Sequence, residues 1–158
     1  MALDLTSLIL HRDANVLVIN KPTNIAVHKG FGDDDTLEKY FHQLQFGLPN
    51  PPQLAHRLDR ATSGCLVLGR HKQALQRLQH LFSSQQIEKK YLAIVVGQPQ
   101  ASGTIELKLA KKEKAKHRWW MEVSDSGQDA RTDYKILKTD GALSLVELSP
   151  KTGRTHQL

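Results

Sequence analysis

The sequence predicts an α+β fold, in which a mixed, mainly antiparallel sheet is flanked by a few helices. Short apolar runs that end at glycine, proline or asparagine are its commonest pattern, and such runs are typical of strands. Helical periodicity occurs in only two segments, too few and too irregularly placed for a doubly wound parallel sheet. A length of 158 residues suits one domain, so a single domain is expected over residues 1–158.

Strands are expected where an apolar or alternating run meets a turn signal. The first such run, Val16–Ile19, ends at the breaker sequence Asn-Lys-Pro. Within residues 104–109, Ile105, Leu107 and Leu109 alternate with polar residues, so they share one side of a strand. The other extended segments are expected at residues 25–30, 54–59, 65–69, 89–97, 130–138 and 142–150, the last two joined by a turn at 139–141.

Two helices are expected from apolar residues spaced three and four apart. The first covers residues 33–45, where three acids precede the apolar face and Asp35 or Thr36 can serve as N-cap. The second covers residues 71–86. The apolar face of the first helix comprises Leu37, Tyr40, Phe41 and Leu44, and that of the second comprises Ala74, Leu75, Leu78, Leu81 and Phe82.

Composition narrows the class of protein. Hydrophobic residues make up 39% of the chain and charged residues 24%, enough for a core and unlike a disordered chain. A net charge of +6 favours a polyanionic partner such as RNA or DNA, although a basic surface without such a partner is equally compatible with it. Cys65 is the single cysteine, which excludes an internal disulfide and a cysteine-based zinc site. It lies in an apolar run, so a buried structural thiol is expected.

Several other classes lack their sequence signals. The first ten residues contain an acid and no basic segment, and no apolar run approaches the roughly 20 residues that span a bilayer. A cytoplasmic protein with no membrane partner is therefore expected. The histidines have no metal-ligand spacing, and neither a P-loop nor a dinucleotide fingerprint occurs, so neither a metal nor a cofactor is expected.

Residues 54–64, LAHRLDRATSG, place Asp59 between Arg57 and Arg60 before a turn of small residues. In an extended segment Arg57 and Asp59 project to the same side. One interpretation is an exposed ion pair worth about 0–1 kcal/mol. The other is a carboxylate held at the end of a strand for chemistry. These residues alone favour the ion pair.

Four segments together resemble the RluA-type pseudouridine synthase family. HRLDRATSG matches the family signature His-Arg-Leu-Asp-x-x-Thr-Ser-Gly at every fixed position, and VINKPTNIAVHKG, KKYLAIVVG and GRTHQL resemble further family segments in family order. The resemblance implies the pseudouridine synthase catalytic fold. It also implies isomerisation of specific uridines in rRNA or tRNA, by cleavage of the N-glycosidic bond and re-attachment through C5, without a cofactor.

The resemblance also implies residue roles. Asp59 corresponds to the essential aspartate, with nucleophilic attack and proton abstraction both left open, and Arg154 to the arginine that favours its ionised form. Tyr91 corresponds to the tyrosine that lies against the flipped uracil. Arg57 is expected to fill the space that the flipped base leaves, or to contact the displaced strand. Leu158 is expected to pack against the base. His56 and Thr62 are also expected to take part in substrate binding.

Residues 108–118 carry six Lys or Arg and one Glu, a local charge of +5, and Trp119 and Trp120 follow. Basic residues beside aromatic ones suit phosphate contact with base stacking, so Lys111 and Lys112 are expected to bind RNA. A solvated hairpin with a buried tryptophan is the competing interpretation.

Two departures from the family pattern bear on activity. A separate N-terminal RNA-binding domain is not expected, and the chain is expected to be truncated at its C-terminus because family members continue beyond GRTHQL. A non-catalytic RNA-binding fragment is therefore an alternative to an active monomeric isomerase. A glycosidic hydrolase is a third possibility, but it would need a second carboxylate paired with Asp59.

Overall fold

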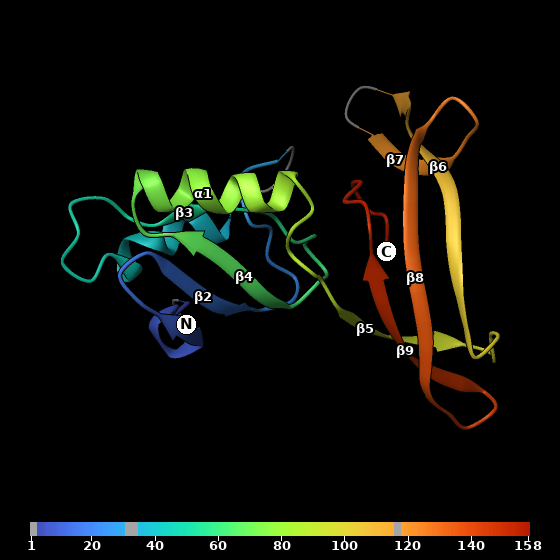
Figure 1. Ribbon diagram of the computed structural model, residues 1–158. Coiled ribbons are helices and arrows are strands. Elements are labelled where there is room, and N and C mark those ends of the chain that lie inside the picture. Colours follow the sequence, from blue (N-terminus) through green and yellow to red (C-terminus); the bar gives the residue numbers. More distant parts are fainter. Residues whose placement is uncertain (1–2, 31–34, 116–117) are drawn as a thin grey trace. The chain divides into compact units, whose positions relative to one another are not determined.

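The computed structural model describes residues 3–30, 35–115 and 118–158, and for residues 114, 115 and 118 it describes the backbone alone. The chain divides into two compact units, Met1–Gln86 and Ile87–Leu158. Each unit has its own antiparallel sheet, shown in Figure 1. The α+β class predicted from the sequence is confirmed, because short helices flank the first of these sheets.

The first unit has a four-stranded sheet in the order β1-β2-β4-β3. Its strands are β1 (Ile9–Arg12), β2 (Val16–Lys21), β3 (Gln53–Leu54) and β4 (Gly64–Gly69). In the central ladder Leu17 pairs with Leu68 and Ile19 with Leu66, and all four side chains are fully buried. The expected strands at 16–19 and 65–69 are thus confirmed, and their inward-facing residues form the core of this unit.

The strand alternation that buries these leucines places Cys65 on the other side of β4, where it is exposed. The prediction that the Cys65 thiol is buried was therefore wrong. An apolar run shows that a strand is present, but neighbouring residues in a strand face opposite ways, so the run does not by itself show that each of its residues is buried.

The first expected helix is a 3₁₀ helix, η2 (Leu37–Leu44), with Leu37, Phe41 and Leu44 buried. Neither proposed residue caps it through its side chain. Instead, the N–H groups of Leu37 and Glu38 donate to the carbonyls of residues 26 and 27, at 2.9 and 3.1 Å. The backbone expected to be a strand at 25–30 therefore satisfies the start of the helix and forms only one isolated bridge, Ala26 with Thr36.

The second expected helix is α1 (Lys72–Ser83), which packs on β4 (Figure 1). A further 3₁₀ turn, η1 (Thr6–Leu8), precedes β1. Gly69 allows α1 to approach closely, because a methyl group on it would lie 2.6 Å from Cα of Leu75. Of the expected apolar face only Ala74 is buried, and the other members are half-buried.

The second unit has a five-stranded sheet in the order β5-β9-β8-β6-β7. Its strands are β5 (Tyr91–Val96), β6 (Ser102–Ala115), β7 (Arg118–Val123), β8 (Gln128–Thr139) and β9 (Leu143–Pro150). The long strands β6 and β8 run side by side in Figure 1. The expected strands are confirmed, but β6 continues through most of the basic stretch and forms a hairpin with β7. On β5, the alternate residues Leu92, Ile94 and Val96 are exposed.

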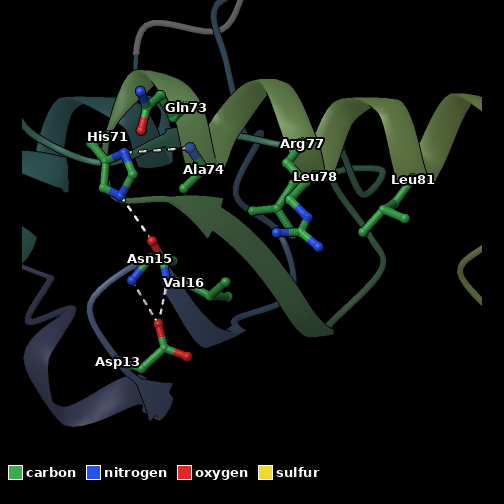
Figure 2. A pocket seen from close by; sticks show the side chains of 9 residues that line it. All are labelled: Asp13, Asn15, Val16, His71, Gln73, Ala74, Arg77, Leu78 and Leu81. Atoms are coloured by element: carbon green, nitrogen blue, oxygen red, sulfur yellow. Dashed lines mark hydrogen bonds between the residues drawn. The ribbon is translucent and has the colours of Figure 1, made fainter.

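A pocket of about 370 Å³ lies beside α1 in the first unit (Figure 2). Its polar rim is largely engaged in local bonds. The ring of His71 caps α1 through Nδ1 and contacts Asn15 Oδ1 through Nε2 at 3.0 Å. Asp13 Oδ1 accepts from the N–H groups of Asn15 and Val16, each at 2.7 Å. These bonds shape the β1–β2 turn, and none of the candidate site residues lines the pocket.

Lys21, the last residue of β2, is fully buried. Its ammonium donates to the carbonyls of Pro22 at 2.8 Å, Arg60 at 3.2 Å and Thr62 at 2.8 Å. Burial lowers the pKa of Lys21, and the negative charge of Asp59 opposes that change. The side chain therefore joins the end of β2 to a loop about 40 residues further along the chain.

Among the described residues no helix is both long and apolar enough to cross a membrane.

Replacement Asp13→Asn should reduce the acid sensitivity of the fold. Hydrogen bonds from the N–H of Val16, from His11 and from the N–H of Asn15 lower the pKa of Asp13 from 3.8 to about 2. A depressed carboxyl pKa stabilises the folded state above pH 4, and this contribution is lost as the pH falls toward 2. Urea unfolding between pH 6 and 2 should show the variant less stable at pH 6, with the difference vanishing near pH 2. A constant difference across this range would contradict the assignment.

Replacement Lys21→Met should lower the free energy of unfolding by about 1–3 kcal/mol. Three partly buried carbonyls lose their donor, and this loss outweighs the relief of removing a desolvated charge. The matched control is Lys72→Met on the exposed face of α1, with an expected change within about 0.5 kcal/mol. Denaturant unfolding of both variants measures the difference, and equal effects would show that the three bonds contribute no net stability.

Candidate active site

The loop that carries Asp59 is fixed through its backbone. The N–H of Thr62 donates to the carbonyl of Asp59 at 3.0 Å and closes a turn. The carbonyls of Arg60 and Thr62 accept from Lys21, and the carbonyl of Ala61 accepts from the hydroxyl of Thr23 at 2.8 Å. Three successive carbonyls are thus bound by Lys21, at the end of β2, and by Thr23, just after it, which orients the residues at the start of the turn.

Asp59 and Arg57 project to the same side, with Arg57 Nη2 4.0 Å from Asp59 Oδ1. The side chains are 36% and 54% exposed, respectively, so the attraction between them is screened by water. The strand expected over residues 54–59 is not formed beyond its first residue, because β3 ends at Leu54 and the following residues bend. Arg57 and Asp59 therefore share a side within a loop. The pair leaves the Asp59 carboxylate accessible from solvent beside two cations, Arg57 and the buried Lys21.

His56 is bound to the elements beneath the loop. Its Nε2 accepts from the N–H of Val67 in β4 at 3.0 Å, and its ring stacks on Phe82 of α1 with centroids 4.3 Å apart. Because Nε2 accepts, the neutral ring carries its proton on Nδ1. Thr62 is half-buried, and its main-chain carbonyl is one of the groups bound by Lys21. In this structure both residues support the Asp59 loop.

In the second unit, Arg154 lies in the loop that follows β9. The side-chain amide of Gln157 organises this loop: its Oε1 accepts from the N–H of Arg154 at 2.9 Å and from the hydroxyl of Thr152 at 2.8 Å. Its Nε2 donates to the carbonyl of Arg131 at 3.0 Å and to Thr132 Oγ1 at 2.9 Å in β8. Arg154 Nε donates to the carbonyl of Asp129 at 2.9 Å, so the guanidinium is anchored at one nitrogen.

Tyr91 begins β5, is half-buried, and pairs with Leu148 of β9. Two residues earlier, Lys89 reaches the Arg154 loop, because a methyl group on Gly153 would lie 3.7 Å from its Nζ. Burial lowers the pKa of Lys89. The start of β5 and the Arg154 loop therefore lie together at one end of the second sheet.

The β6–β7 hairpin carries Lys111 and Lys112, both exposed. Lys112 pairs across the hairpin with Glu122 at 3.3 Å, and Lys111 pairs with Glu113. The side chains of Lys114, Lys116 and Arg118 lie outside the described residues. Trp119 and Trp120 are 38% and 43% exposed, so the alternative of a buried tryptophan was wrong. The hairpin is solvated and presents lysines beside accessible rings.

The candidate residues thus fall into two groups. Asp59, Arg57, His56 and Thr62 gather around one loop of the first unit, whereas Tyr91, Arg154, Lys111, Lys112 and the exposed Leu158 belong to the second. Within the described ranges, the His, Cys, Asp and Glu side chains form no group of three or more that could hold a metal ion.

Sequence reasoning assigned no specific role to Lys21 or Gln157. Both stand inside quoted motifs, NKP and GRTHQL, and that position was the available signal. Lysine is almost never fully buried unless its charge is satisfied, so its burial becomes informative only when the fold is known.

The chain is similar to several known proteins. The family model described as RNA pseudouridylate synthase matches residues 15–158. An uncharacterized RNA pseudouridine synthase of Zymomonas mobilis is 40% identical over 151 residues, covering 95% of this chain and 69% of that protein. The ribosomal large subunit pseudouridine synthase D of Xylella fastidiosa is 38% identical over 153 residues, covering 95% of this chain and 46% of that protein.

A solved structure of human RNA pseudouridylate synthase domain containing 4 is similar, with a TM-score of 0.81 and 31% identity over 97% of this chain and 62% of that one. The chain therefore spans about half to two thirds of the length of these relatives. Since the family match extends over most of the chain, the resemblance seen in its motifs is confirmed. The chain belongs to the RNA pseudouridylate synthase family.

Proposed function

We propose that this protein isomerises uridine in RNA to pseudouridine, with Asp59 as the catalytic carboxylate. The observation that carries the proposal is the Asp59 turn, whose three successive carbonyls are bound by Lys21 and Thr23 while the carboxylate stays accessible. A reacting group on a loop with a fixed backbone can be held in productive geometry, which is a large part of enzymatic rate enhancement.

The reaction conserves all atoms of the nucleotide. The bond between N1 and C1′ of the ribose breaks, the uracil turns, C5 bonds to C1′, the C5 proton leaves, and N1 gains a proton. Asp59 acts either as nucleophile at C1′ or as base toward a ribose proton. Both roles require an ionised carboxylate. The positive charges of Arg57 and Lys21 lie near the Asp59 carboxylate.

The remaining roles belong to the same proposal. Arg154 supplies a further positive charge to the reacting centre, and Tyr91 lies against the uracil. The target nucleotide must leave its stack before its sugar can be reached. Arg57, with its planar guanidinium on the solvent side of the turn, occupies the vacated space or contacts the displaced strand. Leu158 packs against the base, and His56 and Thr62 contribute to substrate binding by supporting the Asp59 loop.

The proposed RNA surface is the β6–β7 hairpin, through Lys111 and Lys112. Each is paired with a glutamate at an exposed position, where a phosphate can compete for the ammonium at small energetic cost. The substrate is rRNA or tRNA. The name of the Xylella relative specifies the large ribosomal subunit for that protein, which supports rRNA as the first substrate to test. We also propose that the protein is a monomer and that it acts in the cytoplasm.

Replacement Asp59→Asn should abolish turnover and keep RNA binding, because the amide cannot act as nucleophile or base. Pseudouridine in rRNA and tRNA transcripts, mapped by carbodiimide-dependent stops of primer extension, should fall by at least about 10²-fold. The matched control is Asp125→Asn, an exposed acid in the turn after β7, which should leave turnover unchanged.

The products discriminate among the alternatives. Stops that persist in Asp59→Asn would refute its catalytic role. RNA binding without stops in the parent would instead support a non-catalytic RNA-binding module. Free uracil in the products would indicate hydrolysis, which calls for a second carboxylate close to Asp59.

The double replacement Lys111→Gln and Lys112→Gln should weaken RNA binding and flatten its salt dependence. Each lost phosphate contact reduces the slope of log affinity against log salt by about 0.7–0.9, so the pair should reduce it by about 1.4–1.8. The control Lys29→Gln with Lys72→Gln makes the same change of charge on exposed positions of the first unit. Filter binding from 50 to 300 mM salt measures both. Equal slopes for the two double variants would exclude a specific role for the hairpin.

A further inference from the structure

Trp119 connects the hairpin to the Arg154 loop. Its indole stacks on the ring of His156, with centroids 5.2 Å apart and planes only 11° from parallel. The two residues lie 37 positions apart in the sequence. Trp119 belongs to β7 and His156 to the loop after β9. The contact therefore joins two elements that are separated by β8 and β6 in the sheet.

In the Arg154 loop, Arg154 and Gln157 make hydrogen bonds that fix the backbone, and His156 lies between them. Around Arg154 and Gln157, main-chain and side-chain bonds fix the loop on β8, including the N–H of Gln157 to the carbonyl of Arg154 at 3.2 Å. His156, between them, has a φ of +52°, a left-handed conformation that side chains with a Cβ disfavour. His156 is the residue of this loop that the Trp119 ring contacts.

The same indole also contacts a proposed RNA-binding cation. Lys111 Nζ lies 5.2 Å from the centroid of the Trp119 ring, within the range of a cation–π attraction. One ring therefore touches both Lys111, on the surface proposed to meet phosphate, and His156, in the loop that carries Arg154. Trp120 faces the other way on β7 and bonds Glu122 through its Nε1 at 3.3 Å.

We propose that Trp119 is a positioning residue, through which RNA bound at Lys111 stabilises the active arrangement of the Arg154 loop. This inference rests on the proposed function. RNA phosphate at Lys111 restrains the Lys111–Trp119 contact, and the restrained indole in turn restrains His156. The hairpin thus contributes to turnover as well as to binding.

The central test is Trp119→Leu beside Trp119→Phe. The leucine variant keeps an apolar side chain but cannot stack in parallel on His156, so kcat for pseudouridine formation should fall about 10- to 100-fold with a smaller change in KM. The phenylalanine variant retains a stacking ring and should recover most of the loss. A rise in KM alone in Trp119→Leu would overturn the inference, because it would mean that the ring only grips RNA.

A second readout does not depend on activity. Hydrogen exchange of the Arg154 and Gln157 amides should accelerate several-fold in Trp119→Leu, return toward the parent rate in Trp119→Phe, and stay at the parent rate in Trp120→Leu. Unchanged exchange in Trp119→Leu would overturn the inference even if the parent is active. If the parent forms no pseudouridine, the proposed function fails, while accelerated exchange would still show that Trp119 positions the loop.

Phe46→Leu controls for a general loss of stability. Phe46 is an exposed ring with Arg12 4.2 Å from its centroid, the same kind of cation–π contact in the other unit. Its loss should leave kcat, KM and the exchange of the Arg154 loop unchanged. Effects equal to those of Trp119→Leu would show that any lost ring contact acts in the same way, and would refute a specific role for Trp119.

Discussion

The buried ammonium of Lys21 is the interaction on which the Asp59 loop depends. A charge removed from water must be satisfied by polar groups, and here the carbonyls of Pro22, Arg60 and Thr62 do so. Two of them belong to the turn that follows Asp59. Folding of the sheet buries Lys21 at the end of β2, where it pairs with Gly64 of β4, and the need to satisfy its charge then determines the path of the turn. A structural requirement of the core thereby places the candidate catalytic carboxylate.

In the second unit a neutral side chain, that of Gln157, fixes the loop that carries Arg154. The side-chain amide of Gln157 has both donors and acceptors, so it can bind the carbonyl of Arg131 and the N–H of Arg154 at once. In both units a polar side chain within a motif binds the backbone of a neighbouring segment, while the residues assigned to chemistry remain accessible. This division explains why the motifs combine residues proposed to contact substrate with residues that shape the loops.

Local patterns predicted much of the fold. β2, β4 and α1 follow from hydrophobic periodicity, and the turn between β8 and β9 from its Asp-Gly pair, because these signals act over a few neighbouring residues. The failures have a different origin. The expected cap of η2 is replaced by carbonyls at Ala26 and Val27, and Cys65 is exposed because one face of β4 is uncovered at that position. Each depends on which distant segment packs nearby.

The sequence by itself determined the chemical inventory and the family: Asp59, Tyr91 and Arg154 stand in motifs whose residue types and order are legible without coordinates. Only the tertiary structure decided which residues support them. The bonds from Lys21 to Thr62, the stack of His56 on Phe82 and that of Trp119 on His156 join residues 26 to 41 positions apart. Such contacts arise when strands pair and loops close, and no local pattern of polarity encodes them.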